Sequence, residues 1–204
     1  MESAVTDIRP LFSIGYATKP IATYIEQLHH YNVDVVADIR SVPYSKAFHD
    51  YHQEALRHTL KASGIGYVYL GPELGPRSKD PAHYDERRQV QFDRLMESAL
   101  FKSGIQRLFD GIDKGYTIAL SCAEKDPAIC HRSLLVGWSL LHQYGCELQH
   151  ILHEGELEGQ IALESRLMQT TDTFPDMLMD EPEAIQLAYR RQCQNCAYRI
   201  PEAD

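Results

Sequence analysis

The amino-acid sequence predicts an α/β protein built on a mostly parallel sheet of about five strands, with helices covering both faces. Two observations support this prediction. Short apolar runs of strand length alternate along the chain with longer segments whose apolar residues recur at helical spacing. One of the short runs, at 33–39, is apolar almost throughout, which is typical of a parallel strand buried on both faces. Such alternation produces right-handed β-α-β units, so we expect a Rossmann-like sheet.

Several segments have the length and the apolar character of buried strands. Glycine, proline or polar residues bound each of them, and these residue types interrupt regular structure. The strands predicted in this way occupy residues 11–15, 33–39, 66–70, 116–121 and 147–152.

The first half of the chain predicts two helices between its strands. Apolar residues at helical spacing follow Pro20, so the first helix is expected to begin there and to end near Asn32. The second helix is predicted at 53–62, with Gly64 ending it. Residues 71–76 contain two prolines and two glycines and are predicted to form a rigid loop.

The middle of the chain carries two further helical patterns. Residues 87–114 are predicted to be largely helical, with Gly104 dividing the segment into two helices. Asp126 followed by Pro127 is the signature of a helix N-cap with proline at the first helical position. This signature places 130–132 in the first turn of a helix that runs to about residue 145.

The sequence changes in character after about residue 155. We therefore predict an α/β core domain at 1–155 and a helical C-terminal extension at 156–204. The extension is expected to contain a helix around 161–168, a linker at 170–182, a terminal helix at 183–191 and then a Cys-x-x-Cys pair. Its expected role is to cap the site described below or to make a contact in a homo-oligomer.

Composition excludes some classes of function. The chain has 204 residues and a formal net charge of −9, which argues against a broadly basic nucleic-acid binder but leaves room for a local anion pocket. No apolar run approaches the roughly 20 residues that span a bilayer, and the start of the chain lacks the pattern of a signal peptide. We therefore expect a cytoplasmic protein with no membrane contact. Its five cysteines favour free thiols, a redox pair or metal ligands over a disulfide framework.

The predicted topology brings chemically versatile side chains to one edge of the sheet. In parallel sheets, ligands bind outside the carboxyl ends of the strands. Polar and ionisable residues follow several of the predicted strands here, and packing alone does not explain them. The residues expected at this edge are Gly15, Tyr16, Thr18, Asp38, Arg40, Ser41, Glu73, Cys122, Glu124, Cys130, His131 and Arg132.

The two cysteines at this edge are candidate catalytic residues. A thiol at a helix start, next to an imidazole and a guanidinium, has a lowered pKa, and Cys130 fits that description. Cys122, at the strand end, is predicted to face it across the loop. Three functions fit such a pair, namely a nucleophilic thiolate, a redox pair and two metal ligands, while small buried apolar side chains are the structural alternative. His131, Glu124 and Asp38 are candidate general acids or bases beside them.

Two arginines predict a small anionic ligand. Arg40 and Arg132 present planar guanidinium groups that suit a phosphate or a carboxylate, and the alternative is that each pairs with a neighbouring acid, Asp38 or Glu124, as scaffolding. The chain lacks the glycine-rich signatures of dinucleotide and P-loop sites, and the segment between Cys122 and Arg132 is too long for a Cys-x5-Arg phosphate loop. Further ligand-binding residues are predicted at Gly15, Tyr16, Ser41 and Glu73.

Cys193 and Cys196 form a lone Cys-x-x-Cys pair near the end of the chain. A structural zinc site needs four ligands, so two cysteines by themselves predict a metal only weakly. Cys146, Cys130 or one of ten histidines would have to complete the set. A thiol pair with no fixed role is the alternative.

Three motifs resemble one known family. They are Ser-Ile-Gly-Tyr-Ala-Thr at 13–18, Val-Asp-Val-Val-Ala-Asp-Ile-Arg-Ser-Val-Pro at 33–43 and Cys-Ala-Glu-Lys-Asp-Pro-Ala-Ile-Cys-His-Arg at 122–132. Together they resemble the domain-of-unknown-function family numbered 488, over residues 11 to 155. The resemblance implies an α/β fold in small cytoplasmic bacterial or archaeal proteins and no settled reaction. Tyr16 departs from the family pattern, in which many members carry histidine.

Two classes of function therefore stand as hypotheses. The first is an enzyme in which Cys122 or Cys130 acts as a thiolate on a small anionic substrate held by Arg40 and Arg132. The second is a binding or sensing module in which the same pocket captures an anion or a metal ion. A metal-dependent partner-binding tail is a weaker third hypothesis. An acid near the thiol and a lowered thiol pKa favour the enzyme, whereas sulfur and imidazole converging on one point favour a metal site.

Overall fold

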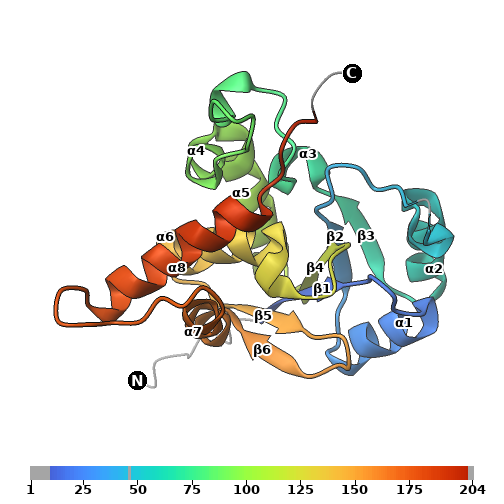
Figure 1. Cartoon of the computed structure of the whole chain (residues 1–204). Helices are drawn as coiled ribbons and strands as arrows, with labels where there is room; N and C mark the ends of the chain where they lie inside the picture. The colour runs from blue at the N-terminus through green and yellow to red at the C-terminus, as the bar shows by residue number, and fades with distance from the viewer. Residues whose placement is uncertain (1–9, 46, 202–204) are drawn as a thin grey trace, which may run out of the picture.

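A computed structural model describes residues 10–45 and 47–201. Its centre is a six-stranded sheet in the order β3-β2-β4-β1-β5-β6 (Figure 1). The first five strands are parallel and β6 runs antiparallel to β5, which confirms the mostly parallel α/β fold. The strands are β1 Leu11–Gly15, β2 Val35–Asp38, β3 Gly66–Tyr69, β4 Ile118–Cys122, β5 Leu148–Ile151 and β6 Leu157–Gly159.

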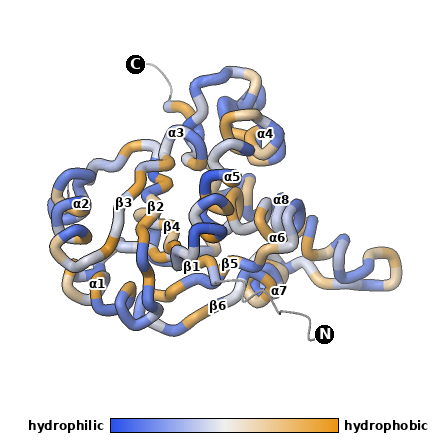
Figure 2. Tube along the Cα trace, turned by 180° about the vertical axis from the view of Figure 1, so that it is seen from behind, coloured by the Kyte–Doolittle hydropathy of each residue, from blue (hydrophilic) through white to orange (hydrophobic). Residues whose placement is uncertain are grey.

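Helices cover the sheet on both sides, as predicted. They are α1 Ile21–His30, α2 Gln53–Ala62, α3 Gly71–Leu74, α4 Phe92–Glu97, α5 Ala99–Asp113, α6 Trp138–Tyr144, α7 Gln160–Thr170 and α8 Glu181–Cys196. Successive strand residues alternate between two hydrophobic clusters, with Phe12 on the side of α1 and α2 and Leu11 on the side of α5 to α8. The central strands are accordingly hydrophobic along most of their length (Figure 2).

The strand ends are in register at the edge where the site was predicted. Gly15 of β1 pairs with Cys122 of β4, and Asp38 of β2 pairs with Ser121. The residues that directly follow β1, β2 and β4 therefore leave the sheet at the same level. This register is the physical basis for bringing distant segments of the chain into one site.

The predicted division of 87–114 at Gly104 is wrong. The break lies at Ser98, which leaves helical geometry and accepts a hydrogen bond from the backbone N–H of Phe101. Gly104 lies inside α5, where an added Cβ would meet the side chains of Glu73 and Leu74. Gly104 therefore serves close packing of α5 on α3, a tertiary role that looks like a helix break in the sequence. Residues 87–91 precede α4 and are not helical.

The helix after Asp126 begins later than predicted. Asp126 does cap a turn, but this is a short 3-10 helix at Pro127–Ile129. Cys130 then adopts extended geometry, with φ −120° and ψ 142°. Its carbonyl accepts the N–H groups of Ser133 and Leu134, so the helix starts after Cys130, with a π-helical segment Arg132–Gly137 that leads into α6. Cys130 thus precedes the helix and does not lie in its first turn.

Three smaller differences complete the comparison. The 71–76 segment begins with the short helix α3 and is not simply a loop. Strand β6 was not predicted, because only three residues pair with β5 there. The terminal helix α8 extends to Cys196, so the Cys-x-x-Cys pair lies inside it and does not follow it.

The C-terminal extension packs on the core. The side chain of Gln192 in α8 donates a hydrogen bond of 2.7 Å to the carbonyl of Ala128, and Ala184 and Ala188 share a hydrophobic cluster with Leu134. The boundary between 155 and 156 remains a prediction. Within the described part of the chain, no helix has the length and apolar character needed to cross a membrane.

Candidate functional site

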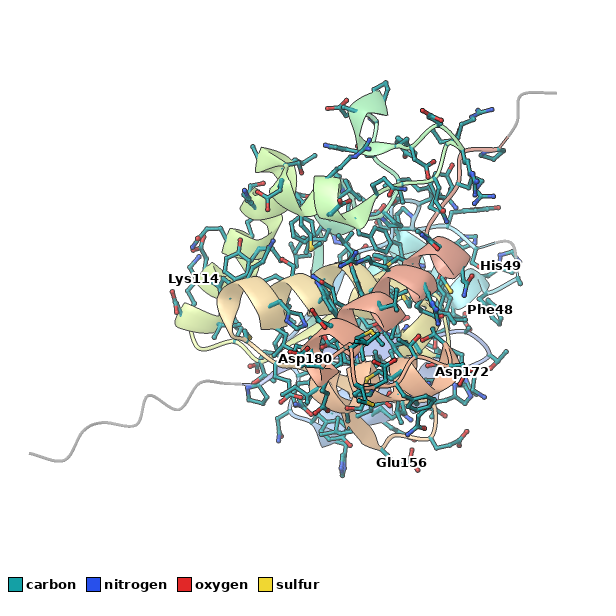
Figure 3. The ribbon with its side chains drawn as sticks, turned by 60° about the vertical axis from the view of Figure 1, so that its left-hand side comes forward. Phe48, His49, Lys114, Glu156, Asp172 and Asp180 are labelled. Atoms are coloured by element: carbon teal, nitrogen blue, oxygen red, sulfur yellow. The ribbon has the colours of Figure 1, made fainter. Side chains whose placement is uncertain are left out.

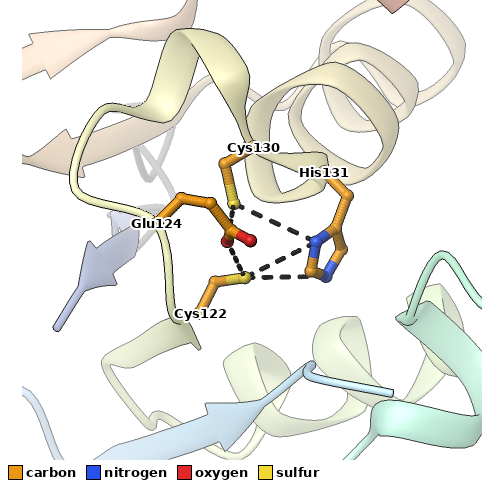
Figure 4. A group of neighbouring side chains, drawn as sticks. All are labelled: Cys122, Glu124, Cys130 and His131. Carbon is orange, nitrogen blue, oxygen red and sulfur yellow. Dashed lines mark hydrogen bonds between the residues drawn. The ribbon is translucent and has the colours of Figure 1, made fainter. Parts of the chain in front are cut away.

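Four ligand-bearing side chains converge just beyond the end of β4. They are Cys122, Glu124, Cys130 and His131 (Figure 4). One sulfur, nitrogen or oxygen atom from each lies within 4.8 Å of the corresponding atom of every other. Across residues 10–45 and 47–201, no second group of three or more such side chains lies this close together.

The turn that carries Glu124 depends on a glycine in the neighbouring strand. The backbone carbonyl of Glu124 lies where a side chain on residue 15 would begin, so a Cβ at Gly15 would overlap it. Gly15 was predicted as a ligand-binding residue. In the structure it lies beneath the turn and leaves space for it.

Both thiols contact the same carboxylate oxygen. Cys122 Sγ and Cys130 Sγ lie 2.8 Å and 3.0 Å from Glu124 Oε2. Within the described residues no lysine or arginine side chain forms an ion pair with this carboxylate. Burial, followed by the nearby sulfur of Cys130, raises the pKa of Glu124. Ionisation of more than one of these three groups would bring like charges into direct contact.

His131 faces this cluster with one ring nitrogen and the backbone with the other. Its Nδ1 lies 3.5 Å from Cys122 Sγ and 4.0 Å from Cys130 Sγ. Its Nε2 lies 3.0 Å from the carbonyl oxygen of Ile39. Because a carbonyl only accepts hydrogen bonds, Nε2 carries a proton, and Nδ1 presents a lone pair to the two sulfurs in the neutral ring and an N–H in the protonated ring. Burial opposes the charged ring, but contact with the Cys130 sulfur raises the pKa of His131.

The surroundings shift the pKa values of the two thiols in opposite directions. Burial raises the pKa of Cys130, but contact with the Cys122 thiol and then the charges of Arg132 and His131 lower it well below the usual value. The N–H of Arg132 also donates to Cys130 Sγ at 3.4 Å, in the manner of a helix cap. Burial, and then its interaction with Cys130, raises the pKa of Cys122. The surroundings of the pair therefore favour ionisation of Cys130 over that of Cys122.

Arg132 stabilises the turn that carries Glu124. Its side chain is fully buried and donates to two backbone carbonyls, those of Glu124 at 2.6 Å and Lys125 at 3.1 Å. It was predicted to hold an anionic ligand or to pair with the Glu124 carboxylate. The structure places it instead against the backbone of the turn, where it fixes the position of Glu124.

Arg40 is held by Asp38 in a buried bidentate pair. Its Nε and Nη2 donate to the two carboxylate oxygens at 2.8 Å and 2.6 Å. Tyr67 donates to the same carboxylate at 2.8 Å, and Arg40 Nη1 donates to the Tyr16 hydroxyl at 3.1 Å and to the carbonyl of Tyr51 at 2.8 Å. The fully buried Asp38 thus pairs with Arg40, as the scaffolding alternative predicted. Arg40 also lines a cavity.

A cavity of about 190 Å³ opens onto the cluster. Cys122 is among the residues that line this cavity and Cys130 is not, although both cysteines are buried. The cavity is lined by Tyr16, Arg40, Ser41, Val42, Tyr44, Pro76, Arg77, Cys122, Ala123, Glu124 and His131.

Arg77 was not among the predicted site residues. Its backbone N–H donates to Ser41 Oγ at 3.0 Å, and its guanidinium lies 4.7 Å from the centre of the Tyr198 ring. The sequence feature that could have predicted Arg77 is its position after Gly75 and Pro76, in the loop that follows β3 at the same sheet edge.

Six predicted site residues lie outside both the cluster and the lining of the cavity. Three of them, Gly15, Asp38 and Arg132, support the site as described above, and the other three are Glu73, Cys193 and Cys196. Glu73 forms an ion pair with Arg107 of α5. Cys193 and Cys196 lie in α8, where no third cysteine, histidine, aspartate or glutamate within the described residues completes a group with them. Burial raises the pKa of Cys193 to about 12.

The fold and the cluster define an α/β protein with a Cys-Glu-Cys-His site at the carboxyl end of its sheet. Residues 20–139, more than half of the chain, match the model of a family described as a domain of unknown function, DUF488. The chain belongs to this family, which confirms the resemblance drawn from its motifs. A search of curated proteins finds no match.

Proposed function

We propose that this protein binds a divalent metal ion of the Zn²⁺ type through Cys122, Cys130, His131 and Glu124. The cavity next to the metal then admits a small anionic ligand. The observation that carries this proposal is the orientation of His131, whose Nδ1 faces both sulfurs while Nε2 donates to Ile39. Histidines that bind metals are commonly oriented by such a hydrogen bond from the second ring nitrogen.

The distances support a tetrahedral ion. Zinc lies about 2.3 Å from thiolate sulfur and about 2.0–2.1 Å from imidazole nitrogen, which places sulfur and nitrogen roughly 3.6 Å apart. The separations here are 3.5 Å for Cys122 and 4.0 Å for Cys130. Two thiolates, an imidazole and a carboxylate form a donor set that favours Zn²⁺ over Mg²⁺ or Ca²⁺, which prefer oxygen ligands.

Charge balance supports the same conclusion. A thiolate at Cys130 next to the carboxylate of Glu124 needs a counter-charge in a buried setting. The guanidinium of Arg132, whose charge lowers the pKa of Cys130, donates its hydrogen bonds to the backbone carbonyls of Glu124 and Lys125. A divalent cation at the centre of the cluster neutralises the negative groups directly.

Among the four proposed metal ligands, Glu124 is the one that an incoming small molecule can most readily displace. Its carboxylate oxygen lies 2.8 Å and 3.0 Å from the sulfurs, closer than two ligands of one tetrahedral zinc ion, so it has to move outward when a metal binds. Glu124 also lines the cavity, where Arg40 and Arg77 supply positive charge. A small phosphate or carboxylate therefore fits the position that faces this cavity.

Elemental analysis of the native protein tests the metal proposal. We expect one metal ion per chain, with its loss in Cys122→Ser, Cys130→Ser and His131→Gln. Cys146→Ser is the matched control, because Cys146 is a half-buried free thiol outside the cluster. The double change Cys193→Ser and Cys196→Ser tests the tail separately. A metal that is retained by all three cluster variants, or that is absent from the native protein after growth with zinc, contradicts the proposal.

Thiol-dependent catalysis by Cys122 is a second candidate, favoured by the place of Cys122 in the cavity lining and by the carboxylate beside its sulfur. In this alternative Glu124 Oε2 takes the proton of Cys122, 2.8 Å away, and the sulfur forms a bond to an electrophilic centre of a small anionic substrate. The bond between that centre and its leaving group breaks, and the leaving group departs with the bonding electron pair and the proton held by Glu124. Alkylation by iodoacetamide followed by peptide mass mapping separates the candidates. Rapid labelling at Cys122 in native protein that contains no metal favours the enzyme, and protection that disappears with a chelator favours the metal site.

A further inference from the structure

We propose that two copies of this chain pair through α8, with the apolar segment in front of α8 in each copy occupying a cavity beside α8 of the other. The segment is 171–180, between α7 and α8, and we call it the α7–α8 segment. Asp172 and Asp180, near its two ends, are labelled in Figure 3. This pairing is independent of the proposed metal site.

The α7–α8 segment presents unusually exposed apolar side chains. Met177 is 101% exposed and Leu178 is 94% exposed, and Phe174 is 52% exposed. Large apolar side chains in water carry an unfavourable free energy of about 25 cal/mol for each Å² of surface. Several of them gathered on one projecting segment mark an interaction surface. Figure 1 shows this segment extending away from the sheet, beyond the start of α8.

Hydrogen bonds hold the α7–α8 segment in this conformation. Asp176 accepts the N–H groups of Leu178 and Met179 at 2.7 Å and 3.0 Å, which forms a closed turn with Met177 and Leu178 at its tip. Arg191 of α8 donates to the carbonyl of Thr171 at 3.0 Å. The position of the tip relative to α8 is therefore set within each chain.

The chain also contains a cavity whose lining is partly apolar and partly polar. This cavity of about 430 Å³ lies between α4 and α8. Its large apolar lining residues are Phe92, Met96, Trp138 and Tyr189, and Gln89, Gln91 and Asp93 add polar groups to the lining. The rings of Trp138 and Tyr189 stack at 3.7 Å. Exposed polar residues of α8, among them Arg190, form its rim. Apolar side chains from outside can enter such a space without displacing a buried charge.

The arrangement of both features along α8 identifies a second copy as the partner. The exposed tip precedes the first turn of α8, and the cavity lies against its later turns. When two copies of one helix pair antiparallel about a two-fold axis, the start of each lies beside the later turns of the other. Both tips then reach both cavities at once, as an isologous interface requires.

The charges of α8 agree with this pairing. The helix begins with acidic residues, including Glu181, and carries Arg190 and Arg191 in its second half. An antiparallel pair places the acidic start of each copy beside the basic half of the other, whereas a parallel pair opposes like charges. This self-complementarity favours the same chain over an unrelated protein as the occupant.

Sedimentation velocity over a range of concentrations tests the pairing. We expect a dimer whose dissociation constant rises at least about tenfold in the double variant Met177→Ser, Leu178→Ser. The replaced side chains are exposed, so the fold is expected to persist, and an unchanged circular dichroism spectrum checks this. Leu100→Ser is the matched control, because Leu100 is 55% exposed on α5 and lies outside both surfaces. The control is expected to dimerise normally.

A cross-linking experiment tests the geometry of the pair. Leu178→Cys chains are mixed with Gln186→Cys chains, since Gln186 is exposed and lines the cavity. A short bismaleimide is expected to produce a covalent dimer containing one chain of each kind. In the control, Leu178→Cys chains are mixed with Leu100→Cys chains, and this mixture should not give that product. Three results would overturn the proposal: a protein that is monomeric at every concentration, a dimer that the double variant does not weaken, or equal cross-linking to positions 186 and 100. A monomer would direct the search to a different protein partner.

Discussion

Gly15 and Glu124 are in direct contact, with the carbonyl of Glu124 occupying the space that a side chain on residue 15 would need. Gly15 ends β1 and Glu124 follows β4, so the contact joins the carboxyl ends of two neighbouring strands. The position of the Glu124 carboxylate between two thiols therefore depends on residue 15 of the neighbouring strand being a glycine, which has no Cβ. This contact links the stability of the sheet edge to the geometry of the site.

The first prediction concerns that contact. Gly15→Ala forces the turn at Glu124 away from β1, and overpacking of this kind costs about 1–3 kcal/mol of unfolding free energy. It should also weaken metal binding, because Glu124 and Arg132 move with the turn. Urea denaturation and metal titration measure the two effects. Gly66→Ala is the control, since an added Cβ there first meets a Val35 methyl at 3.2 Å and no backbone atom closer. Equal effects of the two variants would contradict this explanation.

The second prediction concerns the buried pair of Asp38 and Arg40. Both side chains are buried, so Asp38→Asn leaves a guanidinium without its counter-charge and should cost about 3–5 kcal/mol. The exposed pair of Lys102 and Glu97 offers a comparison, where Lys102→Ala should cost no more than about 1 kcal/mol. Chemical denaturation of both variants provides the measurement. A cost below that of the surface pair would show that Asp38 does not neutralise Arg40.

The third prediction concerns His150, which is fully buried in β5 between Ser13 and Gln160. Burial, followed by the charge of Arg132, lowers its pKa from 6.5 to about 3. A depressed pKa means that folding favours the neutral ring. His150 therefore contributes stability above pH 6.5, and this contribution is lost as the pH falls from there toward 3, by at most about 5 kcal/mol.

Denaturation at several pH values measures this loss. His150→Gln keeps a hydrogen-bonding side chain that does not titrate, so its stability should decline less than that of the natural protein between pH 6.5 and pH 4. His58→Gln, at an exposed histidine, should leave the pH profile unchanged. If the two variants have the same profile, the burial of His150 does not determine the acid sensitivity.

The fourth prediction follows from the proposed metal site. A ligand that binds only the folded state stabilises it by RT ln(1 + [L]/Kd), so removal of the metal by a chelator should lower the melting temperature. Added Zn²⁺ should restore it, and Mg²⁺ should not. Calorimetry of the natural protein and of Cys130→Ser tests this. The variant is expected to melt at the same temperature with and without the chelator, and a chelator effect of equal size in both proteins would place the metal elsewhere.

The sequence alone predicted those features that depend on neighbouring residues. Strand β1 and helix α2 have the predicted bounds, because apolar periodicity and a terminating glycine act over a few residues. The convergence of Cys122 and Glu124 with His131 was also predictable. It requires only that strands run parallel and that polar residues follow their carboxyl ends.

Other features depended on contacts between distant segments. The sequence did not distinguish Arg132, which is buried against backbone carbonyls, from an arginine that meets a ligand, because both roles use the same side chain. Arg77 reaches the cavity through the path of a loop, and Gly104 lies inside α5 because α3 packs closely against it. Local patterns determine where strands and helices form, and the packing of elements against each other determines which polar groups face a cavity and which support it.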